Sequence, residues 1–176
     1  MNNIYFFLYK DLYLRVLHKI NTKKYIKSYC NLLRKKGLNI GNVEYIHPSC
    51  WFDNEYYSLI SIGNGVVISK DVSFLTHDYS IHRGLIALNK NISSKGYKRL
   101  LGNIKICDNC FLGYGSLILP NTIIGESCII GAGSVVKGTY EPYSIIVGNP
   151  AKKVGDVRIW TEKKILDNDE LQKLIY

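Results

Sequence analysis

Four histidines are the side chains of this sequence that can exchange a proton near neutral pH: His18, His47, His77 and His82. His77 lies where a run of strand-forming residues, 72–76, gives way to a polar stretch that begins with Asp78. A strand there can hold the histidine backbone while the side chain faces a cleft. An imidazole with a pKa of about 6.5 can take a proton from a hydroxyl, and a neighbouring carboxylate or carbonyl can fix its tautomer. His77 and Asp78 are therefore the candidate catalytic residues; the alternative is that His77 only hydrogen-bonds its own loop.

A repeat of six residues supplies the strands that would position His77. Aliphatic or aromatic residues recur at every sixth position, and a mostly small residue follows each by four. The main run is Ile106, Leu112, Ile118, Ile124, Ile130 and Val136, and two shorter runs are Ile40, Ile46, Phe52 and Ile62, Ile68, Phe74. This period fits neither a helix nor a simple strand, but it fits a chain that turns a corner every six residues. The sequence predicts an all-β fold, a parallel β-helix of about four coils with the large residues inside.

Breaks in the repeat divide the chain. Residues 38–155 form the predicted β-helix domain, from which a loop at about 77–103 is extruded with five bases and one acid. Long loops in compact domains are usually functional or disordered. Residues 156–176 are predicted to hold a C-terminal helix over Thr161–Leu174, with Thr161 as its candidate N-cap.

The N-terminal arm, residues 1–37, carries most of the net charge of +9, because it has nine Lys or Arg residues against the single acid Asp11. Helices are predicted over 4–20 and 22–36. The simplest role for this arm is to cover the exposed first coil. A second hypothesis is that its bases, interleaved with aromatic residues, lie on an anionic membrane.

Composition also bounds the compartment and the partners. No apolar run near the start approaches the roughly 20 residues of a membrane span, so we expect a cytoplasmic protein, membrane-peripheral only through its arm. The five cysteines are too sparse for a disulfide framework. Cys107 and Cys110 have the spacing of half a zinc site, but Cys110 occupies a small inward position of its hexad. No nucleic-acid-binding motif is present, and no metal is expected.

The hexads, the segment 74–80 (FLTHDYS) and the stretches 130–137 (IGAGSVVK) and 148–152 (GNPAK) resemble the hexapeptide-repeat acetyltransferases. Within that family the chain is most similar to bacterial enzymes of the maltose/galactoside acetyltransferase type that O-acetylate sugars, often in capsule or surface-polysaccharide pathways. The resemblance implies a left-handed β-helix, acetyl-CoA as co-substrate, and a homotrimer with active sites between subunits. The acceptor would be a small-molecule or lipid-linked saccharide.

The resemblance also implies roles for individual residues. His77 would be the general base for direct attack of the acceptor hydroxyl on the thioester, with backbone N–H groups stabilising the oxyanion. Residues that match acetyl-CoA-binding positions are Phe111, Tyr114, Ala132, Gly133 and Lys152. Asp53 and Asn54 are acceptor-binding candidates, although a turn role is an equal alternative. Arg83, the base nearest His77 in the loop sequence, is a third acceptor-binding candidate.

Other activities stay open at this stage. An N-acetyltransferase acting on an amino-sugar nucleotide would use the same base and donor. A serine O-acetyltransferase shares the repeat but carries a longer helical N-terminal domain. A γ-type carbonic anhydrase would use the same solenoid with a three-histidine zinc site. His47, His77 and His82 supply the number of histidines that such a site needs, but they do not recur in phase on successive coils. A solenoid that only binds ligands is the remaining class.

Overall fold

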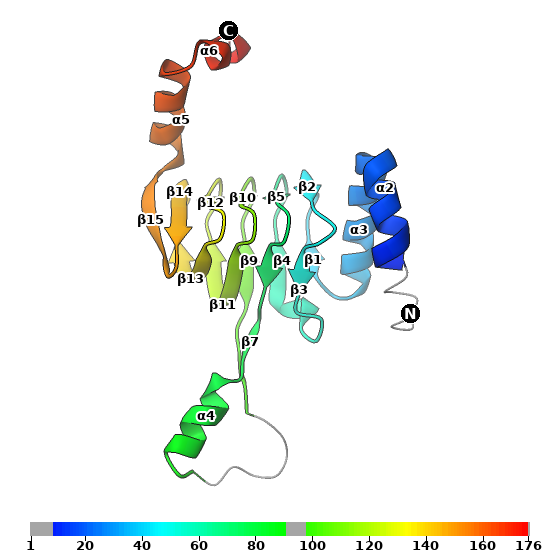
Figure 1. The fold of residues 1–176 in the computed structure, drawn as a ribbon, viewed down its shortest axis with the longest axis vertical. Coiled ribbons are helices and arrows are strands. Elements are labelled where there is room, and N and C mark those ends of the chain that lie inside the picture. Colours follow the sequence, from blue (N-terminus) through cyan, green and yellow to red (C-terminus); the bar gives the residue numbers. More distant parts are fainter. Residues whose placement is uncertain (1–8, 91–97, 176) are drawn as a thin grey trace.

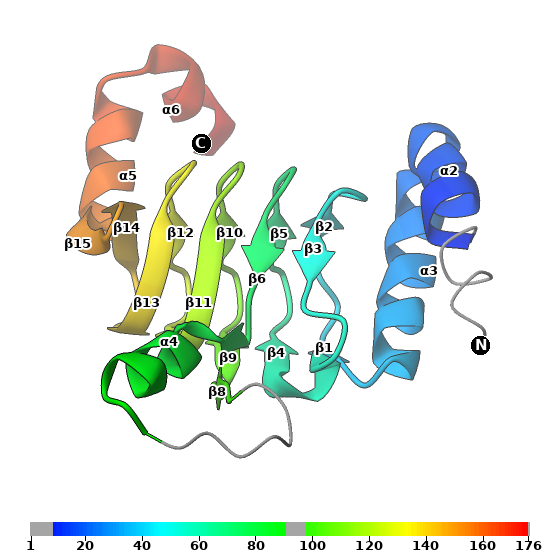
Figure 2. The same cartoon turned by 60° about the horizontal axis from the view of Figure 1, so that its bottom comes forward.

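Each hexad forms a short strand that ends in a turn, and strands of successive coils pair in register. The structure, a computed structural model, describes residues 9–90 and 98–175. Leu112 in β10 pairs with Ile68 in β5 and with Ile130 in β12, so hexads from different coils lie side by side. The coils form the central stack of Figures 1 and 2. Its strands are β1 (Asn39–Ile40), β2 (Tyr45–Ile46), β3 (Trp51–Phe52), β4 (Ile60–Ile62), β5 (Val67–Ile68), β6 (Ser73–Phe74), β9 (Ile104–Ile106), β10 (Phe111–Leu112), β11 (Leu117–Ile124), β12 (Ile129–Ile130), β13 (Val135–Tyr140) and β14 (Ser144–Gly148).

These strands form the walls of a parallel β-helix. One wall runs in the order β14-β12-β10-β5-β2, and a second sheet contains β1-β4-β9-β11-β6-β3 with β13 paired to β11. β11 turns a corner within that second sheet. Its residues Leu117–Ile118 pair with β6, whereas Thr122–Ile124 pair with β9. Three walls therefore enclose one interior, as the period of six predicts.

The interior holds the residues that the repeat places inside. The main-run residues Ile106, Leu112, Ile118, Ile124, Ile130 and Val136 are all at most 1% exposed. The small residues of the repeat are buried at the corners, where some of them donate hydrogen bonds to backbone carbonyls. Cys50 Sγ donates to Ser69 O, and Cys110 Sγ donates to Gly125 O. The six-residue prediction is confirmed, and Cys110 has a structural role, because a thiol at this position fills the corner and satisfies a carbonyl.

Glycines directly after inward aliphatic residues permit the coils to stack closely. A Cβ on Gly113 would lie 2.6 Å from both Ala132 N and Ile130 O. Both are backbone atoms of the next coil, which cannot move aside without disturbing the ladder. These corners therefore need glycine for close approach of backbones.

The N-terminal arm forms η1 (Tyr9–Leu14, a π-helix), α2 (Arg15–Ile20) and α3 (Thr22–Lys35). Asn21 separates α2 from α3, and its side chain accepts a hydrogen bond from Lys24 N. The predicted break at residue 21 is thus present, and residues 1–8 lie outside the described part of the chain. The arm covers the first coil (Figure 1). In the described ranges, no helix is long and apolar enough to cross a bilayer.

The predicted loop at 77–103 is an arm with secondary structure of its own. β7 (His77–Asp78) and β8 (Leu100–Leu101) pair antiparallel, and α4 (Ser80–Ala87) follows β7. Figure 1 shows this arm leaving the side of the solenoid. The prediction of a long loop is corrected here, because a hairpin satisfies the backbone of both strands as they leave the coils. Lys95, one of its five bases, lies outside the described residues.

The C-terminal segment begins with β15 (Ala151–Asp156), which pairs antiparallel with β14 after a turn at Asn149–Pro150. It continues as α5 (Val157–Leu166) and α6 (Asp169–Ile175), which project from the solenoid end (Figure 1). The prediction of one helix capped by Thr161 is wrong. Asp156 caps α5 by accepting from Arg158 N, whereas Thr161 Oγ1 donates to Val157 O inside the helix. The Asp156 carboxylate, five residues before Thr161, already accepts from an N–H group at the start of the helix.

Candidate active site

His77 lies where β6 leaves the solenoid and continues into the β7–β8 arm. Phe74 anchors this point, because its ring is fully buried and stacks on Phe52 with centroids 4.8 Å apart. Thr76 is also fully buried, and its carbonyl accepts from Gly102 N on the returning strand. The side chain of His77 keeps 21% of its surface exposed. A packed backbone therefore presents a partly open imidazole.

Asp53, at the end of β3, is the carboxylate that contacts this imidazole. Its Oδ2 accepts hydrogen bonds from Thr76 Oγ1 at 2.6 Å, Thr76 N at 3.3 Å and His77 Nδ1 at 2.5 Å. Burial by itself would raise the pKa of Asp53, but the hydrogen bonds from Thr76 and His77 outweigh it, so the pKa lies below its usual value. An ionised carboxylate only accepts, so the proton of His77 sits on Nδ1 and the lone pair on Nε2.

The expectation that Asp78 is the carboxylate beside the base is therefore corrected. Asp78 Oδ1 accepts from Ser80 N at 2.7 Å, at the start of α4. Hydrogen bonds from the side chain of Ser80 and from its backbone N–H lower the pKa of Asp78. Successive strand residues point to opposite sides, so a residue adjacent to His77 in a strand is poorly placed to orient it. Asp53, predicted as an acceptor-binding residue, is buried, with its Oδ2 hydrogen-bonded to Thr76 and His77, while Asn54 is exposed in the turn that follows.

Two tyrosines and an arginine flank His77 on the outer side. The ring of Tyr79 meets the imidazole edge-on at 4.9 Å, and the ring of Tyr56 lies 6.1 Å away. Arg99 packs its guanidinium 4.8 Å over the Tyr56 ring and donates to Tyr79 Oη at 2.7 Å and to Glu55 Oε2 at 3.3 Å. The base is thus bordered by aromatic faces and a cation.

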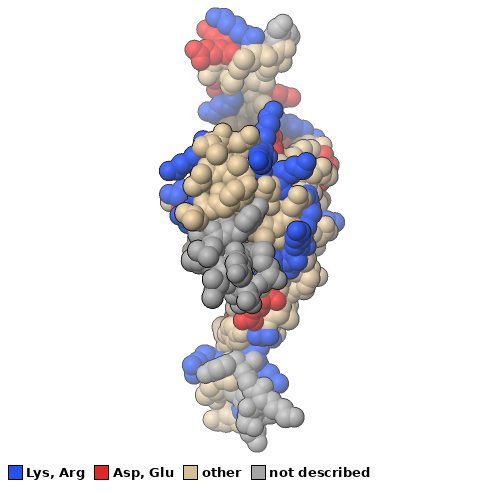
Figure 3. Space-filling view, turned by 90° about the vertical axis from the view of Figure 1, so that its right-hand side faces the viewer, with Lys and Arg blue, Asp and Glu red and all other residues tan. Residues whose placement is uncertain are grey.

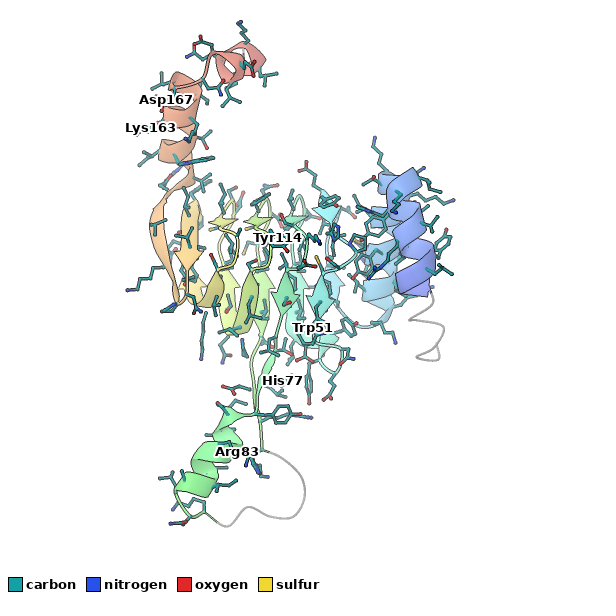
Figure 4. All side chains as sticks on the ribbon, viewed as in Figure 1. Trp51, His77, Arg83, Tyr114, Lys163 and Asp167 are labelled. Atoms are coloured by element: carbon teal, nitrogen blue, oxygen red, sulfur yellow. The ribbon has the colours of Figure 1, made fainter. Side chains whose placement is uncertain are left out.

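Arg99, and not Arg83, is the arginine at this site. Arg83 is exposed on α4, farther out along the arm than His77 (Figure 4). The sequence places Arg83 only six residues from His77, but α4 carries it outward. Antiparallel pairing of His77 with Leu101 brings Arg99 back to where the β7–β8 hairpin leaves the solenoid. Arg99 is one of the five bases of the predicted loop, but nothing in the sequence reveals the pairing that places it here.

A groove of about 420 Å³ opens beside His77. Leu75, Leu100 and Leu119 contribute apolar surface to it, and Lys137 contributes a cation. β13 brings Lys137 to the same groove as the base. Asp78 also lines the groove, so the groove combines a proton acceptor, apolar walls, the cation of Lys137 and a carboxylate.

The residues predicted to bind acetyl-CoA lie elsewhere on the same chain. Phe111 and Tyr114 are 42% and 55% exposed, on β10 and on the corner after it. Ala132 and Gly133 form the exposed corner stacked next to Tyr114, whose carbonyl accepts from Gly133 N. Lys152 is exposed on β15. None of these residues lines the groove beside His77, and Figure 4 shows Tyr114 well separated from His77. One chain therefore does not bring the two sets together.

The other histidines have packing roles. His18 Nε2 lies 2.9 Å from Tyr45 Oη, and its ring is 5.4 Å from that of His47. His47 Nδ1 lies 2.8 Å from Ser49 Oγ, and burial is the main reason that its pKa is lowered. His82 lies on α4, where its Nδ1 accepts from Lys98 N. Across the described ranges, no group of three or more His, Cys, Asp or Glu side chains is placed to hold a metal ion.

Known proteins share this architecture. The family described as "Bacterial transferase hexapeptide (six repeats)" matches residues 102–138. Protein CapG of Staphylococcus aureus is 38% identical over 149 residues, which cover 82% of this chain and 80% of CapG. The dTDP-4-amino-4,6-dideoxy-D-glucose acyltransferase of Escherichia coli is 28% identical over 151 residues, covering 85% of this chain and 64% of that protein.

A solved galactoside acetyltransferase in complex with coenzyme A superposes with a TM-score of 0.58 at 21% identity, covering 87% of this chain and 83% of that chain. This likeness concerns the fold and agrees with the predicted left-handed β-helix. The chain spans about half the length of several other curated relatives that it matches.

Proposed function

This chain belongs to the bacterial transferase hexapeptide family, and we propose that it transfers an acetyl group from acetyl-CoA to a hydroxyl of a sugar or saccharide intermediate. The setting we infer is the biosynthesis of surface polysaccharide in the cytoplasm. The five cysteines of the chain are all free, as is usual in a reducing compartment. The observation that carries the proposal is the hydrogen bond from His77 Nδ1 to the buried carboxylate of Asp53.

Asp53 and His77 supply the proton chemistry. Asp53 keeps the Nδ1 proton in place, so Nε2 is the basic nitrogen. His77 Nε2 accepts the proton of the acceptor hydroxyl while the hydroxyl oxygen attacks the thioester carbonyl directly. The C–S bond breaks, and His77 returns the proton to the departing thiolate. The ionised Asp53 stabilises the imidazolium that exists between these two proton transfers.

The donor side fits an acyl-CoA carried between chains. Phe111 and Tyr114 offer exposed aromatic surface for an apolar pantetheine arm, and Lys152 offers a cation for phosphates. Because these residues and His77 lie apart in one chain, a complete site needs a neighbouring copy whose donor surface faces the groove. This requirement supports a homotrimer with intersubunit active sites.

The acceptor side fits a saccharide. Tyr56 and Tyr79 present rings on which the apolar face of a sugar can pack, and Arg99 can pair with polar or anionic substituents. Asn54 borders the same turn and remains an acceptor-binding candidate. The similarity to the Escherichia coli aminosugar acyltransferase favours one alternative, N-acetylation of an amino-sugar nucleotide by the same base.

Thiol release from acetyl-CoA tests the proposal. The purified wild type and the His77→Ala variant are each assayed with maltose, a galactoside, N-acetylated sugars and an amino-sugar nucleotide. We expect release that depends on a hydroxyl acceptor and falls with His77→Ala by about 100-fold or more, as for loss of a general base. Release only with the amino-sugar nucleotide would replace O-acetylation by N-acetylation. No acceptor-dependent release from any member of the panel would contradict the transferase proposal.

A further inference from the structure

One face of the N-terminal arm packs on the solenoid. Leu14 and Leu17 of the arm are buried, as are Tyr25, Tyr29 and Leu33 of α3. These side chains join the same core as the first coil. Arg34 adds hydrogen bonds to the carbonyls of Ile40 and Gly41. This buried face accounts for the capping role.

A second apolar face of the same arm is exposed. Leu12, Val16 and Ile20 are 67%, 52% and 74% exposed, and Tyr13 beside them is 44% exposed. Leu12, Val16 and Ile20 are four residues apart, so they follow one another along one side of a helix. They are not needed to cover the coil, because Leu14 and Leu17 already do so. Exposed aliphatic residues in a contiguous row indicate a surface that binds something apolar.

Cations border this apolar row. Residues 12–36 contain eight Lys or Arg residues and no Asp or Glu. Arg15 and Lys19 lie in α2, as Val16 and Ile20 do. With Leu12 and Val16 they line a hollow of about 400 Å³, whose other side is formed by residues 47–49 of the first coil and Lys70 of the second. Figure 3 shows this end of the molecule, with Lys and Arg side chains around an uncharged surface. Apolar side chains flanked by cations are the combination that anionic lipid headgroups and acyl chains require.

We propose that this surface, formed by Leu12, Tyr13, Val16, Ile20, Arg15 and Lys19 and called here the arm surface, binds an anionic phospholipid membrane. The aliphatic row enters the boundary between headgroups and acyl chains, and the cations contact lipid phosphates. Nucleic acid would use the cations but not the exposed aliphatic row. Because the arm lies at one end of the solenoid (Figure 1), docking leaves the groove beside His77 free. The proposal does not depend on which group is acetylated.

Vesicle co-sedimentation of the full chain tests it. The probes are vesicles of phosphatidylcholine alone and of equal parts phosphatidylcholine and phosphatidylglycerol, at about 50 mM and 500 mM salt, where screening differs strongly. We expect binding to the anionic vesicles at low salt and its loss at high salt or on neutral vesicles. Arg15→Gln with Lys19→Gln should lower the partition coefficient about thirtyfold, since each cation near such a surface contributes about fivefold.

Two further variants separate lipid binding from other effects. Leu12→Ser with Val16→Ser and Ile20→Ser should abolish binding while leaving the melting temperature unchanged, because these side chains are exposed. The matched control changes exposed residues of similar type on α5 and α6: Lys163→Gln, Lys164→Gln, Leu166→Ser and Leu174→Ser. This control should bind as the wild type does. Equal binding by all variants, absence of binding to anionic vesicles, or a change only in oligomeric mass on removing the aliphatic row would overturn the proposal.

Discussion

Replacing Asp53 by Asn removes one charge from the proposed catalytic pair with little change of shape. Three donors converge on Oδ2, two from Thr76 and one from His77. They should hold the amide oxygen of the new side chain in the Oδ2 position, because the amide nitrogen cannot accept. The tautomer of His77 is then kept, and the loss is the negative charge that stabilises the imidazolium during the reaction.

The size of the effect follows from that charge. Two unit charges about 4 Å apart interact by about 4 kcal/mol at an effective dielectric constant near 20. The imidazole is partly exposed, so solvent screens part of this energy. We expect kcat to fall by about 100- to 1,000-fold, which corresponds to about 3 to 4 kcal/mol in the activation free energy. The KM for acetyl-CoA should change little, because Asp53 is buried beneath the base and away from the donor surface.

Asp78→Asn is the matched control. Asp78 Oδ1 accepts one exposed hydrogen bond from Ser80 N, so its replacement should cost about 1 kcal/mol of stability and leave kcat within a fewfold of wild type. Both variants are assayed by acceptor-dependent thiol release at a temperature well below their melting points. The reasoning is refuted if Asp53→Asn retains kcat within threefold, or if Asp78→Asn loses as much activity as Asp53→Asn.

Three further outcomes are expected. Because the pKa of Asp53 is lowered in the folded state, its stabilising contribution is present above the unfolded value near 3.8 and is lost as the pH falls below that value. In thermal melts, the melting temperature of Asp53→Asn should therefore fall less steeply with decreasing pH than that of the wild type. Gly113→Ala places a Cβ 2.6 Å from backbone atoms of the next coil, so chemical denaturation should show that the free energy of unfolding falls by about 1–3 kcal/mol. Gly115→Ala has nothing within 4 Å of the new Cβ, so it should lose only about 1 kcal/mol, because of its positive φ. If active sites lie between chains, light scattering should give a trimer, and mixed trimers of His77→Ala and Tyr114→Ala chains should regain activity that neither variant has alone; a monomer, or no regain, would contradict an intersubunit site.

The interior of this fold was predictable from the sequence, because packing in a solenoid is periodic. Each inward residue is specified by its own hexad, so Ile106 through Val136 could be assigned without knowledge of distant contacts. The location of the candidate base was also predictable. The hexads stop after Phe74, and His77 is the first titratable side chain beyond that point.

Boundaries that depend on competing local interactions were less predictable. Thr161 and Asp156 are both good capping residues, and the observed cap depends on where β15 ends. The segment 77–103 was expected to be a loop because its sequence is polar. Pairing of β7 with β8 instead forms a hairpin where this segment leaves the solenoid. In both cases the deciding contact comes from a neighbouring strand.

The sequence by itself therefore determined the repeat, the core and the position of His77, since each follows from residues close together in the chain. The tertiary structure alone decided which side chains surround His77. Asp53 reaches His77 across 24 residues of sequence because β3 and β6 stack in register, and Arg99 lies nearby because β7 and β8 pair. Such contacts depend on strand register, which adjacent residues do not encode, so proximity in the sequence pointed to Asp78 and Arg83 whereas Asp53 and Arg99 lie beside His77.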